Sequence, residues 1–145
     1  KRIQGIMDRP DNGDRWGQIR LAMGESMNRN LSVYRHQAGM EETVRDLQEL
    51  RARYAAVSVH NKRRVFNTDL IFALELGYML DSAEAIAAGA LERKESRGAQ
   101  SRTDFPIRDD ENWLKHILVT QGEAGPVVSH LPVTITNWTP EERKY

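Results

Sequence analysis

The sequence predicts a mainly α protein: a spectrin-like antiparallel three-helix bundle, followed by a long loop and a small C-terminal β-hairpin extension. Apolar residues recur at steps of three and four in three separate stretches, which is the period of an amphipathic helix. A charged segment without that period comes next, and two short apolar runs around a glycine-containing turn close the chain, as in a hairpin.

The first helix is predicted over residues 15–30. Asp14 follows a turn cluster that starts at Pro10 and is the expected N-cap. The residues before this turn are polar, and we expect them to be irregular. The apolar stripe of the helix consists of Trp16, Ile19, Met23, Met27 and Leu31.

The second helix is predicted from about Gly39 to Tyr54, with a charged face opposite its apolar stripe. The third is predicted over residues 69–92, with Asn67 or Thr68 as its N-cap. Its apolar face is broad, which is typical of a helix in the middle of a bundle. Four small residues should let neighbouring elements approach it closely: Gly77, Ala85, Ala88 and Gly89. The broad face itself comprises Leu70, Ile71, Leu74, Tyr78, Met79, Ala83, Ile86, Ala87 and Ala90.

Residues 93–112 contain Gly98 and Pro106 and show no apolar stripe, so we expect a long ordered loop. Residues 113–120 and 127–135 are the candidate hairpin strands, and a tail from Trp138 is expected to be extended. The predicted organisation is a three-helix bundle over 1–94 and a region over 95–145 that holds the loop, hairpin and tail.

Composition excludes several classes of protein. Lysine plus arginine and aspartate plus glutamate both total 21, so the net charge is zero, which argues against a nucleic-acid binder. The absence of cysteine excludes disulfides, iron–sulfur ligation and thiol catalysis within the chain. The most apolar run, residues 70–91, carries Glu75, Asp81 and Glu84, so direct membrane insertion is not expected.

No complete active site is predicted. The four histidines have no metal-ligand spacing, no glycine-rich phosphate loop follows a strand, and no serine sits in a nucleophile elbow. We therefore assign no catalytic, cofactor-binding or metal-binding residue. The basic run Lys62-Arg63-Arg64 has two readings, a contact for an anion or partner and a solvated linker.

The charged block after the third helix is the candidate interface. Its arginines alternate with carboxylates, and two readings remain open: a surface loop held by ion pairs, or a docking surface whose arginines pair with a partner's carboxylates. Trp113 and Trp138 flank the hairpin and are of the type favoured at interfaces. The residues assigned to interface and assembly are Arg97, Gln100, Arg102, Asp104, Arg108, Asp110 and Trp113.

The same block resembles a family signature. The stretch Glu95-Ser-Arg-Gly-Ala-Gln-Ser-Arg-Thr-Asp-Phe-Pro-Ile-Arg-Asp-Asp-Glu-Asn-Trp113 is similar to the C-terminal signature of the succinate dehydrogenase and fumarate reductase flavoproteins. Asn30-Leu-Ser-Val-Tyr-Arg35, Phe66-Asn-Thr-Asp-Leu70 and the terminus Glu141-Glu-Arg-Lys-Tyr145 also resemble that family. Position 100 is glutamine where the family commonly has histidine, so a residue that titrates near neutral pH is missing there.

The resemblance implies the C-terminal segment of a succinate dehydrogenase flavoprotein subunit, which oxidises succinate to fumarate and passes electrons through FAD to an iron–sulfur subunit and quinone. FAD would bind elsewhere in the flavoprotein, and the 145-residue chain alone would be inactive. The implied partners are the FAD-binding and capping domains and the iron–sulfur subunit. The implied location is peripheral, on the cytoplasmic side of the inner membrane.

Two alternatives stay open. One is the equivalent domain of L-aspartate oxidase or of an adenylylsulfate reductase relative, which share the fold; the continuation from Arg108 to Trp113 favours succinate dehydrogenase. The other is a stand-alone helical adaptor without catalysis. The start at Lys1 rather than at a methionine is expected of a fragment and argues against the stand-alone adaptor.

Overall fold

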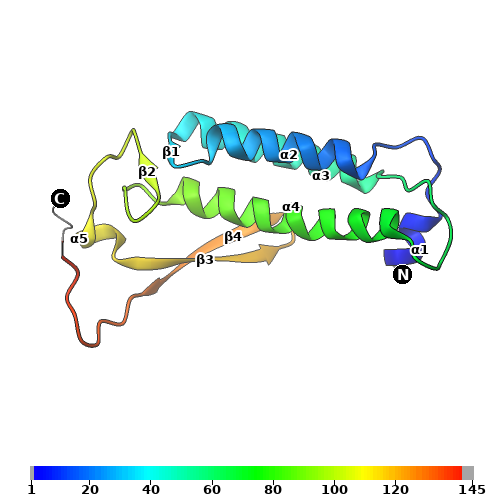
Figure 1. The fold of residues 1–145 in the computed structure, drawn as a ribbon. Coiled ribbons are helices and arrows are strands. Elements are labelled where there is room, and N and C mark those ends of the chain that lie inside the picture. Colours follow the sequence, from blue (N-terminus) through cyan, green and yellow to red (C-terminus); the bar gives the residue numbers. More distant parts are fainter. Residues whose placement is uncertain (1, 142–145) are drawn as a thin grey trace.

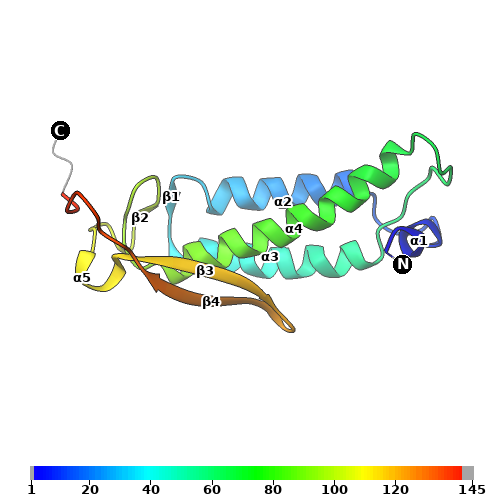
Figure 2. The same ribbon diagram turned by 90° about the horizontal axis from the view of Figure 1, so that it is seen from below.

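Three long helices form the body of the protein. In the computed structural model, which describes residues 2–141, α2 (Trp16–Asn30), α3 (Gln37–Ala55) and α4 (Thr68–Glu92) lie side by side. Successive helices run in opposite directions (Figures 1 and 2). Helix α4 contacts α2 and α3 and also the short N-terminal helix and the hairpin.

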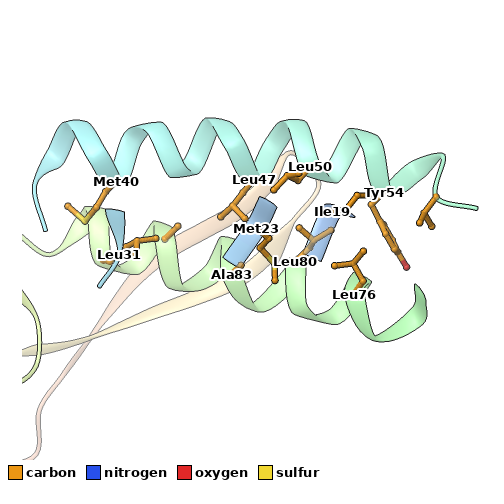
Figure 3. Close-up of a cluster of buried hydrophobic side chains, with 13 residues drawn as sticks. Ile19, Met23, Leu31, Met40, Leu47, Leu50, Tyr54, Leu76, Leu80 and Ala83 are labelled. Carbon is orange, nitrogen blue, oxygen red and sulfur yellow. The ribbon is translucent and has the colours of Figure 1, made fainter. Parts of the chain in front are cut away.

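The core lies where these three helices face one another (Figure 3). Its buried side chains come mostly from α2, α3 and α4 at helical spacing, with Leu31 and Val57 from the residues just after α2 and α3, so the apolar stripes of the sequence meet in one cluster. Tyr54 closes this cluster at the end of α3. The residues of α2 and α3 in it are Ile19, Met23, Met40, Leu47, Leu50 and Tyr54, and those of α4 are Leu76, Leu80, Ala83, Ala87 and Ala90.

Two helix starts differ from the prediction. Arg15, not Asp14, is the N-cap residue of α2, because the Asp14 carboxylate accepts a hydrogen bond from Arg53 Nε at 2.7 Å. Helix α3 begins at Gln37, two residues early. His36 caps it by accepting from Gly39 N at 3.0 Å, and histidine is not among the usual N-cap residues.

The N-cap of α4 is as predicted, but its broad apolar face is not fully buried. Asn67 accepts a hydrogen bond from Leu70 N at 2.9 Å. Ile71, Tyr78 and Ile86, however, are 49%, 59% and 52% exposed. The helix has neighbours on only part of its circumference, so the prediction that this whole face is internal is wrong for these three residues.

The first residues were predicted to be irregular, but they form the helix α1 (Arg2–Met7). This prediction was wrong because the helix is held by distant residues. Ile6 packs in a second small cluster with Val59 and Ala73. The Lys62 ammonium donates to the carbonyl oxygens of Met7 and Arg9 at 2.9 and 3.0 Å, so it satisfies the exposed end of the helix.

The segment between α4 and the hairpin contains regular elements that were predicted as loop. Strand β2 (Ser101–Arg102) lies in this segment and is followed by α5 (Asp110–Trp113). It pairs in parallel with β1 (Tyr34–Arg35), which lies between α2 and α3. Both strands have only two residues, too short for an alternating pattern to reveal them.

The hairpin prediction is confirmed with shifted ends. Strands β3 (Lys115–Gly122) and β4 (Gly125–Pro132) form an antiparallel pair, and the hairpin lies along α4 (Figure 1). A Cβ atom added to Gly89 would lie 3.6 Å from Val119 and 3.8 Å from Ile117, so the hairpin packs closely on that turn of α4. The described part of the tail includes Trp138, which is 87% exposed; residues 142–145 lie outside the described range.

The mainly α architecture with one small antiparallel sheet is therefore confirmed. Among residues 2–141, no helix is both long enough and apolar enough to cross a membrane.

Gly77 marks the closest approach to α4. A Cβ atom there would lie 2.5 Å from the buried Tyr54 hydroxyl and 2.2 Å from Arg2 Nη2. We expect Gly77→Ala to lower the free energy of unfolding by about 1–3 kcal/mol, because overpacking outweighs the better helix propensity of alanine. Urea unfolding followed by circular dichroism measures this.

Gly89→Ala is the matched control, because its new methyl group would meet neighbours only at ordinary contact distance. It should leave stability unchanged or raise it by up to about 1 kcal/mol. Equal unfolding midpoints for the two variants would contradict the packing described for Gly77.

Candidate functional site

The loop between α4 and β3 is organised around a buried carboxylate. Glu95 is 0% exposed. Its oxygens accept hydrogen bonds from Arg93 Nη1 at 2.5 Å, from Arg97 Nε and Nη2 at 2.7 and 3.0 Å, and from the backbone N–H of Asp109 at 2.9 Å. Two arginines and a distant backbone group thus converge on one side chain.

The electrostatic balance keeps Glu95 ionised. Burial alone would raise the pKa of its carboxyl group, since a charge loses hydration in the interior. The hydrogen bonds from Arg97, the Asp109 N–H and Arg93 outweigh burial, so the pKa of Glu95 lies below its ordinary value. The pKa of the Arg97 guanidinium is raised, chiefly by its hydrogen bond to Glu95.

Asp110 extends this network outward. Its two oxygens bind different guanidinium groups, Arg97 on one side and Arg108 at 2.5 Å on the other. Both contacts lower the pKa of the Asp110 carboxyl, that with Arg97 most. Arg108 also donates to the carbonyl oxygen of Glu141 at 2.7 Å, so the same network reaches the C-terminal tail.

A second centre lies at the carboxyl end of α4. Arg102 is 0% exposed and forms a two-point contact with Asp104, with Nε–Oδ1 and Nη2–Oδ2 distances of 2.7 and 2.8 Å. Its Nη1 donates to the carbonyl oxygens of Leu91 and Arg93 at 3.3 and 2.8 Å. A cation at this position satisfies carbonyls that have no partner in the helix and suits the helix dipole.

Asp104 connects this centre to another helix. It accepts a hydrogen bond from the backbone N–H of Gln37 at 2.9 Å, the first residue of α3. The hydrogen bond from Arg102 is the main reason that the pKa of Asp104 is well below its ordinary value. One ion pair therefore joins the end of α4 to the start of α3.

Gln100 completes the second centre. Its Nε2 donates to the carbonyl oxygens of Arg93 and Ala90 at 3.3 and 3.4 Å, and its Oε1 accepts from Arg35 Nη1 at 3.0 Å. Beside it, Ser101 N donates to Val33 O at 3.1 Å. Gln100 thus donates and accepts structural hydrogen bonds here, with no requirement for a titrating group.

Trp113 lies at the far side of the loop. Its ring is half-buried, with the Arg93 guanidinium 5.7 Å and the Lys115 ammonium 4.7 Å from the ring centroid. Arg93 therefore links the tryptophan to Glu95. Trp138, the other tryptophan of this region, has its side chain almost wholly in solvent.

The seven residues assigned from the sequence therefore fall into one continuous loop structure. Arg97, Arg108 and Asp110 lie around Glu95, and Gln100, Arg102 and Asp104 lie at the end of α4. Sequence reasoning did not single out Arg93 or Glu95. The available signal was the spacing of Glu95, two residues from an arginine on each side.

Other features of the described chain do not form a competing centre. Within residues 2–141 there is no group of three metal-ligating side chains that could hold a metal ion. A groove of about 840 Å³ lies between α3, α4 and the hairpin turn, but none of the seven assigned residues lines it. Inside it, Arg51 pairs with Asp81 at 2.6 Å and Glu84 at 2.8 Å.

The fold and the loop define a class of mainly helical proteins with a charged loop whose ion pairs are internal. Comparisons with known proteins show which family has these features. Residues 20–145 match the family described as the fumarate reductase flavoprotein C-terminal region. The fumarate reductase flavoprotein subunit of Haemophilus influenzae is 43% identical over 140 residues, which are 96% of this chain and 23% of the relative. The succinate dehydrogenase flavoprotein subunit of Rickettsia conorii is 42% identical over 86% of this chain and 21% of the relative.

Solved structures agree. An Escherichia coli quinol fumarate reductase chain superposes with a TM-score of 0.91 at 37% identity, over 97% of this chain and 24% of that one. Adenylylsulfate reductase from Archaeoglobus fulgidus shares the fold alone, with a TM-score of 0.77 at 20% identity over 91% of this chain and 21% of that one. The chain belongs to the fumarate reductase flavoprotein C-terminal family. It spans about a quarter of the length of the curated relatives it matches.

Removal of the central carboxylate should destabilise the chain strongly. We expect Glu95→Gln to lower the free energy of unfolding by about 3–5 kcal/mol, because it leaves the largely buried Arg93 and Arg97 without the carboxylate that they share. Glu111→Gln is the matched control: Glu111 is exposed and makes no ion pair in the described range, so its effect should stay within about 0.5 kcal/mol. Similar urea midpoints for both variants would contradict the central role of Glu95.

Stability should fall at acid pH. The pKa values of Glu95, Asp104 and Asp110 are all lowered in the folded chain, so the unfolded chain binds protons more readily. The resulting stabilisation is complete above the unfolded carboxyl values of about 4 and is lost as the pH falls through the lower folded values. Urea midpoints measured from pH 6 down to pH 2 test this. Asp104→Asn should show a shallower decline, and equal slopes would contradict the assignment.

Proposed function

We propose that this chain is the C-terminal segment of the flavoprotein subunit of a succinate dehydrogenase or fumarate reductase, and that its role there is structural. The single observation that carries this proposal is the loop from Arg93 to Trp113, whose family-like residues form a fixed ion-pair network and a helix-end clamp. A loop ordered in this way suits a docking element better than a reaction centre.

In the proposed enzyme, succinate and fumarate are interconverted through FAD, which accepts or supplies the hydride when it is bound. We place FAD and the dicarboxylate site in parts of the flavoprotein that have no counterpart in this chain. The chain's own residues hold the loop, join helix ends and provide surface. The isolated chain is accordingly proposed to be inactive.

The helices are the proposed scaffold. We propose that α2, α3 and α4 act as an antiparallel three-helix bundle of the spectrin type, which would occupy the predicted region 1–94, with the loop, hairpin and tail of 95–145 as its extension. The shared core of the three helices supports this division. The clamp of Arg102 on the end of α4 means that the two regions would move as one body.

The proposed partners are the FAD-binding and capping domains of the flavoprotein and, in the assembled complex, the iron–sulfur subunit. The names of the solved relatives, a quinol fumarate reductase and a Mycobacterium smegmatis Sdh1 complex, support a place in a complex that handles quinone. We propose a peripheral location on the cytoplasmic side of the inner membrane, through that complex.

The geometry suggests how the loop would meet a partner. Glu95 and Arg102 are internal, so they cannot pair with a partner's charges and serve to order the backbone. The tip between the two centres is exposed, and Ile107 there is 78% accessible. We infer that Arg97, Arg102, Asp104, Arg108 and Asp110 fix the loop and that its tip makes the contact.

The assembly role is tested by charge reversal at Arg97. Arg97→Glu would place a carboxylate between Glu95 and Asp110, so we expect both loop order and the yield of flavin-containing complex to fall. Yield is measured by purification through a tag on the iron–sulfur subunit, with succinate turnover recorded in the same samples. Unchanged yield and turnover would show that the proposed role is wrong.

Two further variants separate folding from docking. Ile107→Asp leaves every ion pair intact and should lower complex yield while the chain's unfolding midpoint stays at the wild-type value. Arg20→Glu is the control for an added negative charge, because Arg20 is exposed on α2 and makes no ion pair in the described range. It should leave yield unchanged.

A further inference from the structure

Phe66 stands out at the opposite end of α4 from the loop. Its side chain is 95% exposed, and its backbone has a φ of 51°. In the described chain it is the only residue other than glycine with a positive φ. A bulky side chain in the left-handed region is a real outlier and costs conformational energy.

The surrounding structure holds Phe66 in this conformation. The next residue, Asn67, is buried and donates to the carbonyl oxygens of Asn61 and Arg63 at 2.7 and 2.8 Å, while its own oxygen caps α4. Phe66 itself accepts a hydrogen bond from Thr68 N at 3.2 Å. Strain that neighbours impose in this way is a reason to look for a function.

Within residues 2–141, no side chain covers the exposed Phe66 ring. An apolar residue just before an N-cap usually packs on the fourth residue of the helix, which here is Ile71. Ile71 is 49% exposed and the Phe66 ring projects into solvent, so this contact is not made. Val65, its neighbour, is 69% exposed. The turn therefore presents a large apolar side chain that only another molecule could bury.

The charges beside Phe66 indicate which kind of molecule. Lys62 is occupied with the end of α1, and Arg64 Nη2 donates to Gln4 Oε1 at 3.4 Å. Arg63 is exposed and makes no side-chain hydrogen bond or ion pair within residues 2–141. A membrane surface is bound through several free basic groups acting together, whereas one ring and one free guanidinium fit a defined protein pocket.

We propose that Phe66 and Arg63 form a second docking point, in which the ring enters an apolar pocket edged by a carboxylate on another protein part of the assembled complex. This inference rests on the proposed function and adds a contact to it. The 25 residues of α4 span about 37 Å between the end that follows Phe66 and the end that leads into the loop. The scaffold would thus be held at both ends of its longest helix.

The test uses Phe66→Asn, because asparagine tolerates the left-handed conformation and removes the ring. The unfolding temperature of the purified chain should be unchanged or higher. Complex yield through the tagged iron–sulfur subunit should fall at least about ten-fold. Arg63→Glu should also lower yield, while Arg20→Glu, a matched reversal on α2, should not.

Three results would overturn the proposal. One is wild-type yield from Phe66→Asn, and another is a loss of yield that merely follows a lower unfolding temperature. The third is flotation of the wild-type chain, but not of Phe66→Asn, with vesicles of phosphatidylserine and phosphatidylcholine, which would assign the ring to lipid. If the wild-type chain itself fails to co-purify, the proposed function fails as well, and that result is distinct from co-purification that is insensitive to Phe66.

Discussion

The ion pair between the buried Arg102 and the partly exposed Asp104 is the interaction on which the rest of this structure depends. Its guanidinium collects the carbonyl oxygens at the end of α4, and its carboxylate accepts the first backbone N–H of α3. Helix ends leave such groups without partners, and each would be costly inside a protein if left unpaired. One pair of side chains settles both ends at once, so the loop cannot shift without exposing them. The short parallel pairing of β1 with β2 then follows from the fixed position of the loop.

A buried charge is a weak source of stability, because its lost hydration offsets most of its attraction. It is a strong source of geometry, because a wrong arrangement leaves a charge unpaired. In this chain the buried charges of Glu95 and Arg102 fix the backbone of one loop in this way, Glu95 through the N–H of Asp109 and Arg102 through Asp104. The loop they shape exposes apolar residues such as Ile107, while Glu95 and Arg102 are internal and the partly exposed Arg97, Arg108 and Asp110 are paired with one another or with Glu95. The arginines and aspartates of this segment are therefore largely engaged with one another within the loop.

The sequence predicted most of the helices and the hairpin, because their apolar periods are long enough to be seen. It also gathered the site residues into one block, through their spacing and family resemblance. It missed α1, whose single buried side chain, Ile6, depends on Val59 and Ala73 far along the chain. It also placed Ile71, Tyr78 and Ile86 inside, since a pattern records that a face is apolar but not whether a neighbour covers it.

The sequence by itself therefore determined the three long helices, the hairpin with its turn, a choice of Asn67 or Thr68 as the cap of α4, and the family, because each is a local pattern or a contiguous motif. Only the tertiary structure decided that Glu95 is the centre of the loop, that Arg102 clamps α4 to α3, and that Phe66 is left in solvent. These outcomes depend on groups that are distant in sequence, such as Arg102 and the N–H of Gln37 joined through Asp104. The physical reason is that burial and ion pairing depend on what the fold places nearby, which no single segment encodes.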